Sequence, residues 1–288
     1  MTQARSSEKL QTAFIVVLLL LAVVGLWEGA KAFSRAVNYA LDLPWGGTLD
    51  LRNFNNQQLP HLGDIARSFV EPAQRNGPPL GLILLNASLF TLSSAVIGFV
   101  LGGVLGFLLA IIFAHSRLLQ RGLLPYVVAS QTIPILAIAP MVVVWMRQIN
   151  LTGLAVPIIA AYLTFFPVTV YALRGLTSVS PLQLELMRSY AATRWQILFK
   201  LRIPNALPQI FTALKISATA SVVGTIIGEL PSGIQSGLGG AILNFNQYYV
   251  QGPPRLWATI VAASLVGMLF FGVVALAERL IVRWNRPE

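Results

Sequence analysis

The sequence predicts an all-α membrane protein that crosses the bilayer six times. Of its 288 residues, 56% are hydrophobic and only 10% are charged, well below the roughly 25% that is usual in soluble domains. A chain with so few charges can build a large apolar core but cannot cover it with a water-compatible surface. Its apolar residues also gather in runs of about 20 residues, the length that an α-helix needs to span a bilayer.

The predicted spans follow one another along the whole chain. They cover about residues 10–30, 82–114, 122–146, 151–173, 209–230 and 256–281. The second run is longer than a span needs, which indicates either a tilted helix or one that starts as an interfacial helix. Gly98, Gly102 and Gly106 form a doubled GxxxG pattern in it, and this pattern is typical of close helix packing. Only "RQINL" separates the third run from the fourth, so a tight hairpin is expected there.

The loops between these spans predict the orientation and the domain organisation. With the N-terminus in the cytoplasm, most Lys and Arg residues near the spans fall on the cytoplasmic side, so both termini are expected there. Residues 1–30 then form a cytoplasmic tail and the first span, which is retained because no A-x-A-like cleavage site follows it directly. Residues 31–80 form an extracytoplasmic loop with a short helix near "LGDIARSFVEPA", 81–283 form the core, and 284–288 form a cytoplasmic tail.

Several classes of function are excluded by what the sequence lacks. The chain has no cysteine, and no G-x-x-x-x-G-K-[ST] loop that would bind ATP phosphates. Its net charge of +10 is spread between apolar runs rather than clustered, which argues against nucleic-acid binding. His61 and His115 are expected on opposite sides of the membrane, so no metal site is predicted. No catalytic constellation is visible, and the chain is therefore not expected to be an enzyme.

A basic segment, "RSYAATRWQILFKLRIPNALP", lies between the fourth and fifth spans. Ser180, Pro181 and Gln183 predict a helix start with a capping box. Further on, Pro204 and Pro208 are expected to stop the helix. The segment is thus an amphipathic helical element on the cytoplasmic side, either lying among lipid headgroups or docking to a soluble partner.

On a helical wheel, Met187, Ala191 and Trp195 share one arc with Leu198 and Leu201. The polar residues of the segment fall on the opposite arc; they are Ser189, Thr193, Gln196 and Lys200.

The stretch "ELMRSYAATRWQILFKLRIPNALPQI" resembles the cytoplasmic EAA loop of binding-protein-dependent ABC importer permeases, which share the MetI-like transmembrane domain. Glu185 takes the position of the glutamate, and "RWQ" is similar to the nitrate/sulfonate/taurine-type branch. Three other stretches resemble the family in the same order: "SQTIPILAIAPMVVVW", "FFPVTVYALRGLTSVSPLQLEL" and "VVGTIIGELPSGIQSGLGGAI". Ala191 stands where the family has a turn glycine, so either the turn is made differently or the helix runs on.

The resemblance implies that this chain is the transmembrane permease subunit of an ATP-driven importer in the bacterial inner membrane. It implies two copies of a separate ATPase, which bind ATP and magnesium, so that this chain needs no cofactor of its own. It also implies a second permease subunit, expected to form a homodimer, and an extracytoplasmic solute-binding protein, with membrane lipid around them. The solute would be small and polar or anionic, such as nitrate, a sulfonate or taurine, or a vitamin-precursor or pyrimidine-like heterocycle.

The resemblance places ATPase coupling in a loop at about residues 175–208. The coupling residues it implies are Glu185, Met187, Arg188, Tyr190, Ala191, Arg194, Trp195, Gln196 and Pro204.

Polar and helix-disturbing residues in the third and fifth spans are candidates for the translocation path. They are Gln131, Thr132, Pro134, Pro140, Ser217, Ser221, Thr225 and Glu229. For the hydroxyl residues, close helix packing with backbone hydrogen bonds is the alternative, and for the third span it is a simple kink. Lys215 is expected to snorkel towards the cytoplasm.

An ion- or proton-coupled secondary transporter is the alternative function. It would require charged residues buried in mid-membrane, whereas the candidates in this sequence lie near the ends of spans.

Overall fold

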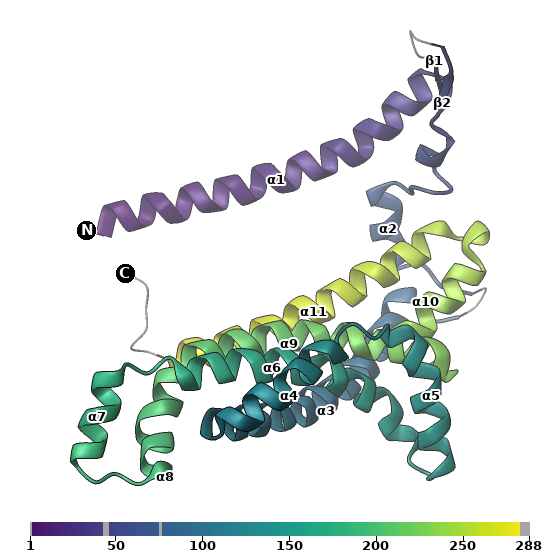
Figure 1. The fold of residues 1–288 in the computed structure, drawn as a ribbon. Coiled ribbons are helices and arrows are strands. Elements are labelled where there is room, and N and C mark those ends of the chain that lie inside the picture. The colour runs from purple at the N-terminus through teal and green to yellow at the C-terminus, as the bar shows by residue number, and fades with distance from the viewer. Residues whose placement is uncertain (1, 43–45, 75–76, 283–288) are drawn as a thin grey trace. The chain divides into compact units, whose positions relative to one another are not determined.

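The computed structural model describes residues 2–42, 46–74 and 77–282, and it is mostly helical (Figure 1). The chain divides into two compact units, Met1–Leu80 with Tyr248–Ala258, and Gly81–Gln247 with Thr259–Glu288. Within the described residues, five helices are long and apolar enough to cross a membrane, and a bent pair of helices makes a sixth candidate. The all-α membrane fold is therefore confirmed. The predicted tail 284–288 lies outside the described residues.

The first unit holds one long helix and a small polar region. Its elements are α1 (Thr2–Ala36), β1 (Ala40–Asp42), β2 (Thr48–Asp50), η1 (Arg52–Phe54) and α2 (Leu62–Ser68). The short helix predicted near "LGDIARSFVEPA" is α2, whereas the antiparallel pairing of β1 with β2 was not predicted. The apolar side chains of Phe14–Leu19 and of Leu21, Val23, Val24 and Leu26 in α1 are exposed, as expected of a helix surrounded by lipid.

Polar contacts of Glu28 hold the end of α1 against the start of α2. Its carboxylate accepts from the Leu62 backbone N–H at 3.1 Å and lies 2.7 Å from Nδ1 of His61. Arg35 Nη2 lies 2.9 Å from His61 Nε2. Because a guanidinium can only donate, Nε2 accepts and the ring proton on Nδ1 is donated to Glu28.

The second unit holds the remaining spans. Its elements are α3 (Leu80–His115, starting at the last residue of the first unit), α4 (Arg117–Ser130), α5 (Ile135–Gln148), η2 (Thr152–Leu154), α6 (Ala155–Thr177), α7 (Pro181–Ser189), α8 (Arg194–Ile197), η3 (Leu198–Arg202), α9 (Ile203–Ser232) and α10 (Leu238–Gln247). After η4 (Tyr249–Gln251), α11 (Pro253–Ile281) begins in the first unit and continues through the second. Figure 1 shows α7 and α8 side by side at one end of the α6–α9 pair and α10 at the other end.

The glycine pattern of α3 is a packing surface, as predicted. A Cβ on Gly98 would lie 2.5 Å from Cβ of Ala160, and a Cβ on Gly102 would lie 2.5 Å from the carbonyl oxygen of Ala161. Real Cβ atoms do not approach other atoms so closely, so only glycine allows α3 to pack this tightly on α6.

An ion pair links α9 to α11. Lys215 Nζ donates to Glu278 Oε2 at 2.6 Å, and each side chain exposes about a quarter of its surface. The structure thus gives the Lys215 ammonium a carboxylate partner three residues before the end of α11, and its snorkelling towards the cytoplasm stays a prediction.

Candidate functional site

The third predicted span is two helices rather than one. The axes of α4 and α5 differ by 96° across the break at residues 131–134. Pro134 is the N-cap of α5, whereas Pro140 lies inside α5 and does not end it. The hydroxyl of Tyr162 on α6 donates to the Ser130 carbonyl at the end of α4, a group that the break frees from helical bonding. The expected kink is thus a sharp break, with Gln131 half-buried and Thr132 exposed.

The segment between α6 and α9, residues 178–202, is called the connector below. It begins with α7, whose N-cap is Ser180, as predicted: the Gln183 N–H donates to Ser180 Oγ at 3.3 Å, and Pro181 occupies the first turn. A complete capping box forms further on, at α8. There the Gln196 N–H donates to Thr193 Oγ1 at 3.3 Å, and the Thr193 N–H donates to Gln196 Oε1 at 2.8 Å.

The turn between α7 and α8 is made at Ala191, which has a φ of +52°. The Ala191 N–H donates to the Arg188 carbonyl at 2.8 Å, and the Ala192 N–H donates to the Met187 carbonyl at 3.1 Å. These two bonds form a Schellman motif, which usually has glycine at this position. The helix α7 therefore ends at this turn, and Ala191 adopts the left-handed conformation that usually requires glycine. The predicted arc that joins Met187 to Trp195 on one continuous helix is wrong, because the turn separates them.

The connector exposes a set of large apolar side chains, which are Leu182, Leu186, Tyr190, Trp195 and Phe199. Tyr190 exposes 78% of its surface and Trp195 64%, while Met187 is half-buried. Leu182, Leu186 and Tyr190 follow one another at intervals of four along α7, so they share a face. The two leucines were missed because the wheel was centred on Met187, although their spacing is visible in the sequence.

Polar and charged side chains surround this apolar face. Glu185, Arg188, Arg194 and Gln196 are all exposed. Trp195 stacks on Phe199, with ring centroids 6.1 Å apart, and its other neighbour is the His115 ring at 6.0 Å. An exposed aromatic surface with a charged rim is the composition of a protein–protein contact.

The connector continues into α9 without a break. Leu198–Arg202 form a π-helical turn, and the Ile203 N–H donates to the Leu198 carbonyl. The predicted helix stop at Pro204 and Pro208 is wrong. Pro204 lies in the first turn of α9, just after the π turn, and Pro208 lies inside the helix. Proline normally clashes with the carbonyl four residues earlier, and a wider turn moves that carbonyl away.

The base of the connector is fixed to two other helices. Leu198 is fully buried in a cluster with Phe113 of α3 and Leu173 of α6. Arg202 Nη1 donates to the Ala114 carbonyl at 2.9 Å, near the end of α3. A displacement of α8 must therefore move α9, and it acts on α3 and α6 at the same time.

The polar face of α9 is buried within the chain. Ser217, Ser221, Thr225 and Glu229 expose no surface, and Ser217 Oγ donates to the Thr164 carbonyl of α6 at 3.2 Å. Ser221 Oγ donates to the Ala218 carbonyl within α9 at 2.9 Å, whereas the buried Thr225 hydroxyl has no hydrogen-bond partner among the described residues. Backbone-bonded packing therefore describes Ser217 and Ser221, and a place on the translocation path stays a prediction for this face.

Glu229 connects three helices. Its carboxylate accepts from Thr91 Oγ1 of α3 at 2.8 Å and from the Gly239 N–H of α10 at 2.7 Å. The Leu238 N–H in turn donates to Thr91 Oγ1 at 2.9 Å. A Cβ on Gly237 would lie 2.3 Å from Cδ of Glu229, so the glycine leaves the space that the carboxylate fills. The Gly239 amide of α10 and the Thr91 hydroxyl thus satisfy the buried carboxyl group of Glu229.

Comparison with known proteins places most of the second unit in one family. The family described as "Binding-protein-dependent transport system inner membrane component" matches residues 102–283. The chain is 33% identical to the formylaminopyrimidine transport permease protein ThiX of Halalkalibacterium halodurans, over 69% of this chain and 77% of that protein.

Two further relatives match a similar share of the chain. It is 30% identical to the riboflavin transport system permease protein RibX of Chloroflexus aurantiacus, over 70% of this chain and 74% of the relative. It is 27% identical to the putative aliphatic sulfonates transport permease protein SsuC of Bacillus subtilis, over 70% and 73% of the two chains.

Proposed function

Because the chain belongs to the binding-protein-dependent transport system inner membrane components, it is the permease subunit of an ABC importer, and we propose that it imports a small polar or anionic solute. The family is a multi-pass membrane component and not a catalytic one. A binding-protein-dependent system also implies an ATPase and a solute-binding protein as partners. Secondary transport, the alternative function, is thereby set aside.

The ATPase docks on the connector in this proposal, and the observation that carries it is the exposed apolar face beside the Ala191 turn. Tyr190 and Trp195 enter a groove of the ATPase as apolar anchors, with Met187 supporting them from its half-buried position. Glu185, Arg188, Arg194 and Gln196 form the polar rim around them. Pro204 begins the helix that carries the movement into the membrane.

The solute path is proposed to lie at the interface of two permease copies, above two ATPase copies. The break between α4 and α5 supports this placement, because Gln131, Thr132 and Pro134 interrupt helical bonding there, and irregular backbone in a membrane is tolerated where it borders a cavity or protein. Pro140 sets the direction of α5 beyond the break. Ser217 joins α9 to α6 through its hydrogen bond, Ser221 and Thr225 continue the same buried face of α9, and Glu229 fixes α10 at the far end of α9.

Both termini are proposed to lie in the cytoplasm of a bacterium, with the protein in its inner membrane. This orientation requires six crossings, so α4 and α5 together must form one broken span. A re-entrant α4–α5 pair would instead reverse α6 and α9 and place Arg174, Arg188 and Arg194 outside, against the preference of basic residues for the cytoplasm. Residues 31–80 are then the outer loop and 81–283 the permease core.

The solute is proposed to be a small heterocycle or a small anion, since the relatives are named for formylaminopyrimidine, riboflavin and aliphatic sulfonates. The test is to reconstitute the chain with its ATPase and binding protein, and to measure ATP hydrolysis with the binding protein loaded with each candidate. One loaded form should raise hydrolysis above that with the empty protein. Uptake driven by an ion gradient without ATP would contradict the proposal.

A further inference from the structure

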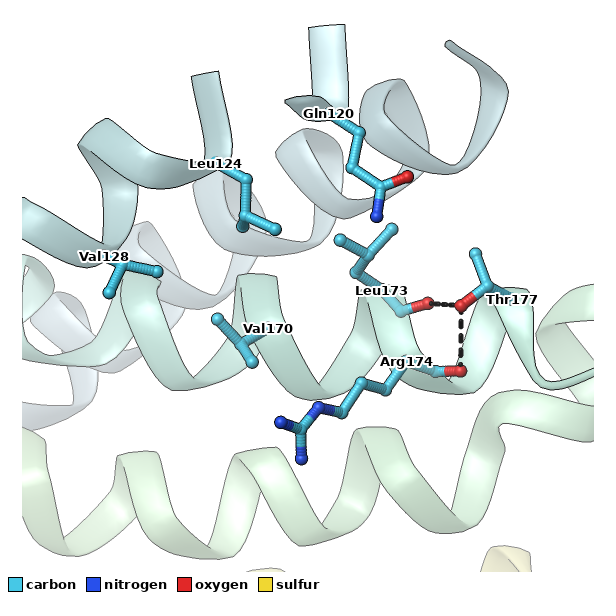
Figure 2. A pocket seen from close by; sticks show the side chains of 7 residues that line it. All are labelled: Gln120, Leu124, Val128, Val170, Leu173, Arg174 and Thr177. Atoms are coloured by element: carbon cyan, nitrogen blue, oxygen red, sulfur yellow. Dashed lines mark hydrogen bonds between the residues drawn. The ribbon is translucent and has the colours of Figure 1, made fainter. Parts of the chain in front are cut away.

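A groove of about 310 Å³ lies between α4 and α6. Figure 2 shows Gln120, Leu124 and Val128 of α4 on one side, and Val170, Leu173 and Arg174 of α6 on the other. Apart from Leu173, which also belongs to the cluster around Leu198, no proposed coupling or path residue lines this groove, so it needs an explanation of its own.

The polarity of the groove changes along its length. Gln120 lies at one end, close to Thr177 of α6, while Val128 and Val170 form the other end (Figure 2). Arg174 folds its side chain back along α6, so that its guanidinium borders the apolar part beside Val170 (Figure 2). The groove is thus apolar at one end and polar at the other, with its one cation at the border of the apolar part, which matches the order of acyl chain, phosphate and headgroup in a phospholipid.

The charge around the polar end has one sign. Neither α4 nor α6 contains an aspartate or glutamate, while Arg117, Arg121 and Arg174 are exposed. Among the described carboxylates, none lies within ion-pair distance of Arg174; the one contact recorded for its guanidinium is the Tyr171 ring, 5.9 Å away. An anionic group is therefore the complementary ligand.

The chain itself leaves this face uncovered, because no residue of α4 is buried. We propose that the groove binds an anionic phospholipid of the cytoplasmic leaflet. Its phosphate pairs with Arg174, its polar headgroup lies near Gln120, and one acyl chain follows Leu124 towards Val128. The choice of leaflet rests on the proposed orientation.

A second copy of the chain fits the groove less well than a lipid does. Copies of one membrane protein insert in the same orientation, so each would bring its own basic end to the same depth. Like charges would then meet at the contact, which costs free energy. A phospholipid instead supplies the opposite charge at that depth and apolar chains below it.

The test counts lipids that stay on the purified full-length protein. The protein is equilibrated with equal amounts of phosphatidylglycerol and phosphatidylcholine, and the retained lipids are identified by native mass spectrometry. The wild type should retain phosphatidylglycerol about fivefold over phosphatidylcholine, the preference that one basic side chain at an anionic surface confers. Arg174→Gln should bring the ratio close to one.

Two further variants keep the test decisive. Arg147→Gln removes the same charge from an exposed arginine of α5 and should keep the wild-type preference. Gln120→Glu adds an acid at the polar end and should lower the preference without touching Arg174. Equal retention of both lipids by the wild type, or the same loss in Arg147→Gln as in Arg174→Gln, would overturn the proposal.

A crosslink identifies the occupant directly. A photoactivatable amino acid in place of Leu124 should capture phosphatidylglycerol, seen as a lipid-mass adduct on the monomer. A crosslinked protein dimer would show that a second copy fills the groove, and the proposal would be wrong.

Discussion

Ala191 holds the turn of the connector in a backbone conformation that costs an L-residue about 1 kcal/mol relative to glycine. Ala191→Gly should therefore stabilise the turn and keep transport, because its Schellman bonds use only backbone atoms. Ala191→Val should impair coupling, since a β-branched residue is strained at positive φ. Transport by the two variants in proteoliposomes checks this prediction, and a severe loss in Ala191→Gly would mean that the segment needs a continuous helix.

Glu229 is the buried acid on which the junction of α3, α9 and α10 depends. Glu229→Ala should leave the Gly239 amide and the Thr91 hydroxyl without this acceptor, at a cost of about 2–3 kcal/mol. The measurement is the temperature at which the protein loses monodispersity in detergent. Glu71→Gln, an exposed acid, is the control and should change nothing. If Glu229→Ala and Glu71→Gln lose monodispersity at the same temperature, the contacts of the Glu229 carboxylate contribute no stability.

At the scale of elements, two neighbouring glycines of α3 distinguish the effect of helix–helix packing from the effect of helix propensity on stability. Gly102 faces the α6 backbone, whereas a Cβ on Gly103 would have nothing within 4 Å. Gly102→Ala should destabilise the protein by about 1–3 kcal/mol through overpacking, while Gly103→Ala should be neutral or stabilising because alanine favours the helix. The same melting measurement in detergent distinguishes them, and equal effects would contradict the α3–α6 contact.

The ion pair between α9 and α11 makes a second prediction at this scale. Lys215→Met should lower stability by about 2 kcal/mol, because it leaves a partly buried Glu278 without its cation. The double variant Lys215→Glu with Glu278→Lys should recover most of that loss. Recovery is read from the melting temperature, and no recovery would show that the two side chains act independently.

The sequence was sufficient to predict where the helices lie, but not how they are joined. The long apolar helices, the Ser180 cap and the GxxxG face follow from local patterns and the structure confirms them, but the third predicted span is broken into α4 and α5. The helix stop predicted at Pro204 was wrong because the π turn before it allows the helix to continue past the proline, and no known residue pattern predicts a π turn. Thr91 could not be found from the sequence, since it meets Glu229 only when residues 138 positions apart come together.

The site residues show the same limit. The resemblance located the connector, but the turn at Ala191 decides which side chains share a face. That turn separates Trp195 from Met187, which a helical wheel drawn through the turn could not show. Leu182, Leu186 and Tyr190 precede the turn, and their shared face follows from their spacing alone.

At the scale of the whole molecule, an exposed connector continues into a membrane helix without a break. In the proposed function, movement of a bound ATPase would reach α9 through the π turn, and the contacts of Arg202 and Leu198 would carry it to α3 and α6. The proposal therefore makes the connector the contact through which ATP hydrolysis drives transport.

The most direct test of this central claim is co-purification of the ATPase with the double variant Arg194→Glu, Trp195→Ala. The matched control is Arg147→Glu with Trp145→Ala, which makes the same substitutions at exposed positions of α5. Both should insert into the membrane, and only the connector variant should lose the ATPase and its solute-stimulated hydrolysis. A connector variant that still co-purifies with an active, solute-stimulated ATPase would contradict the account.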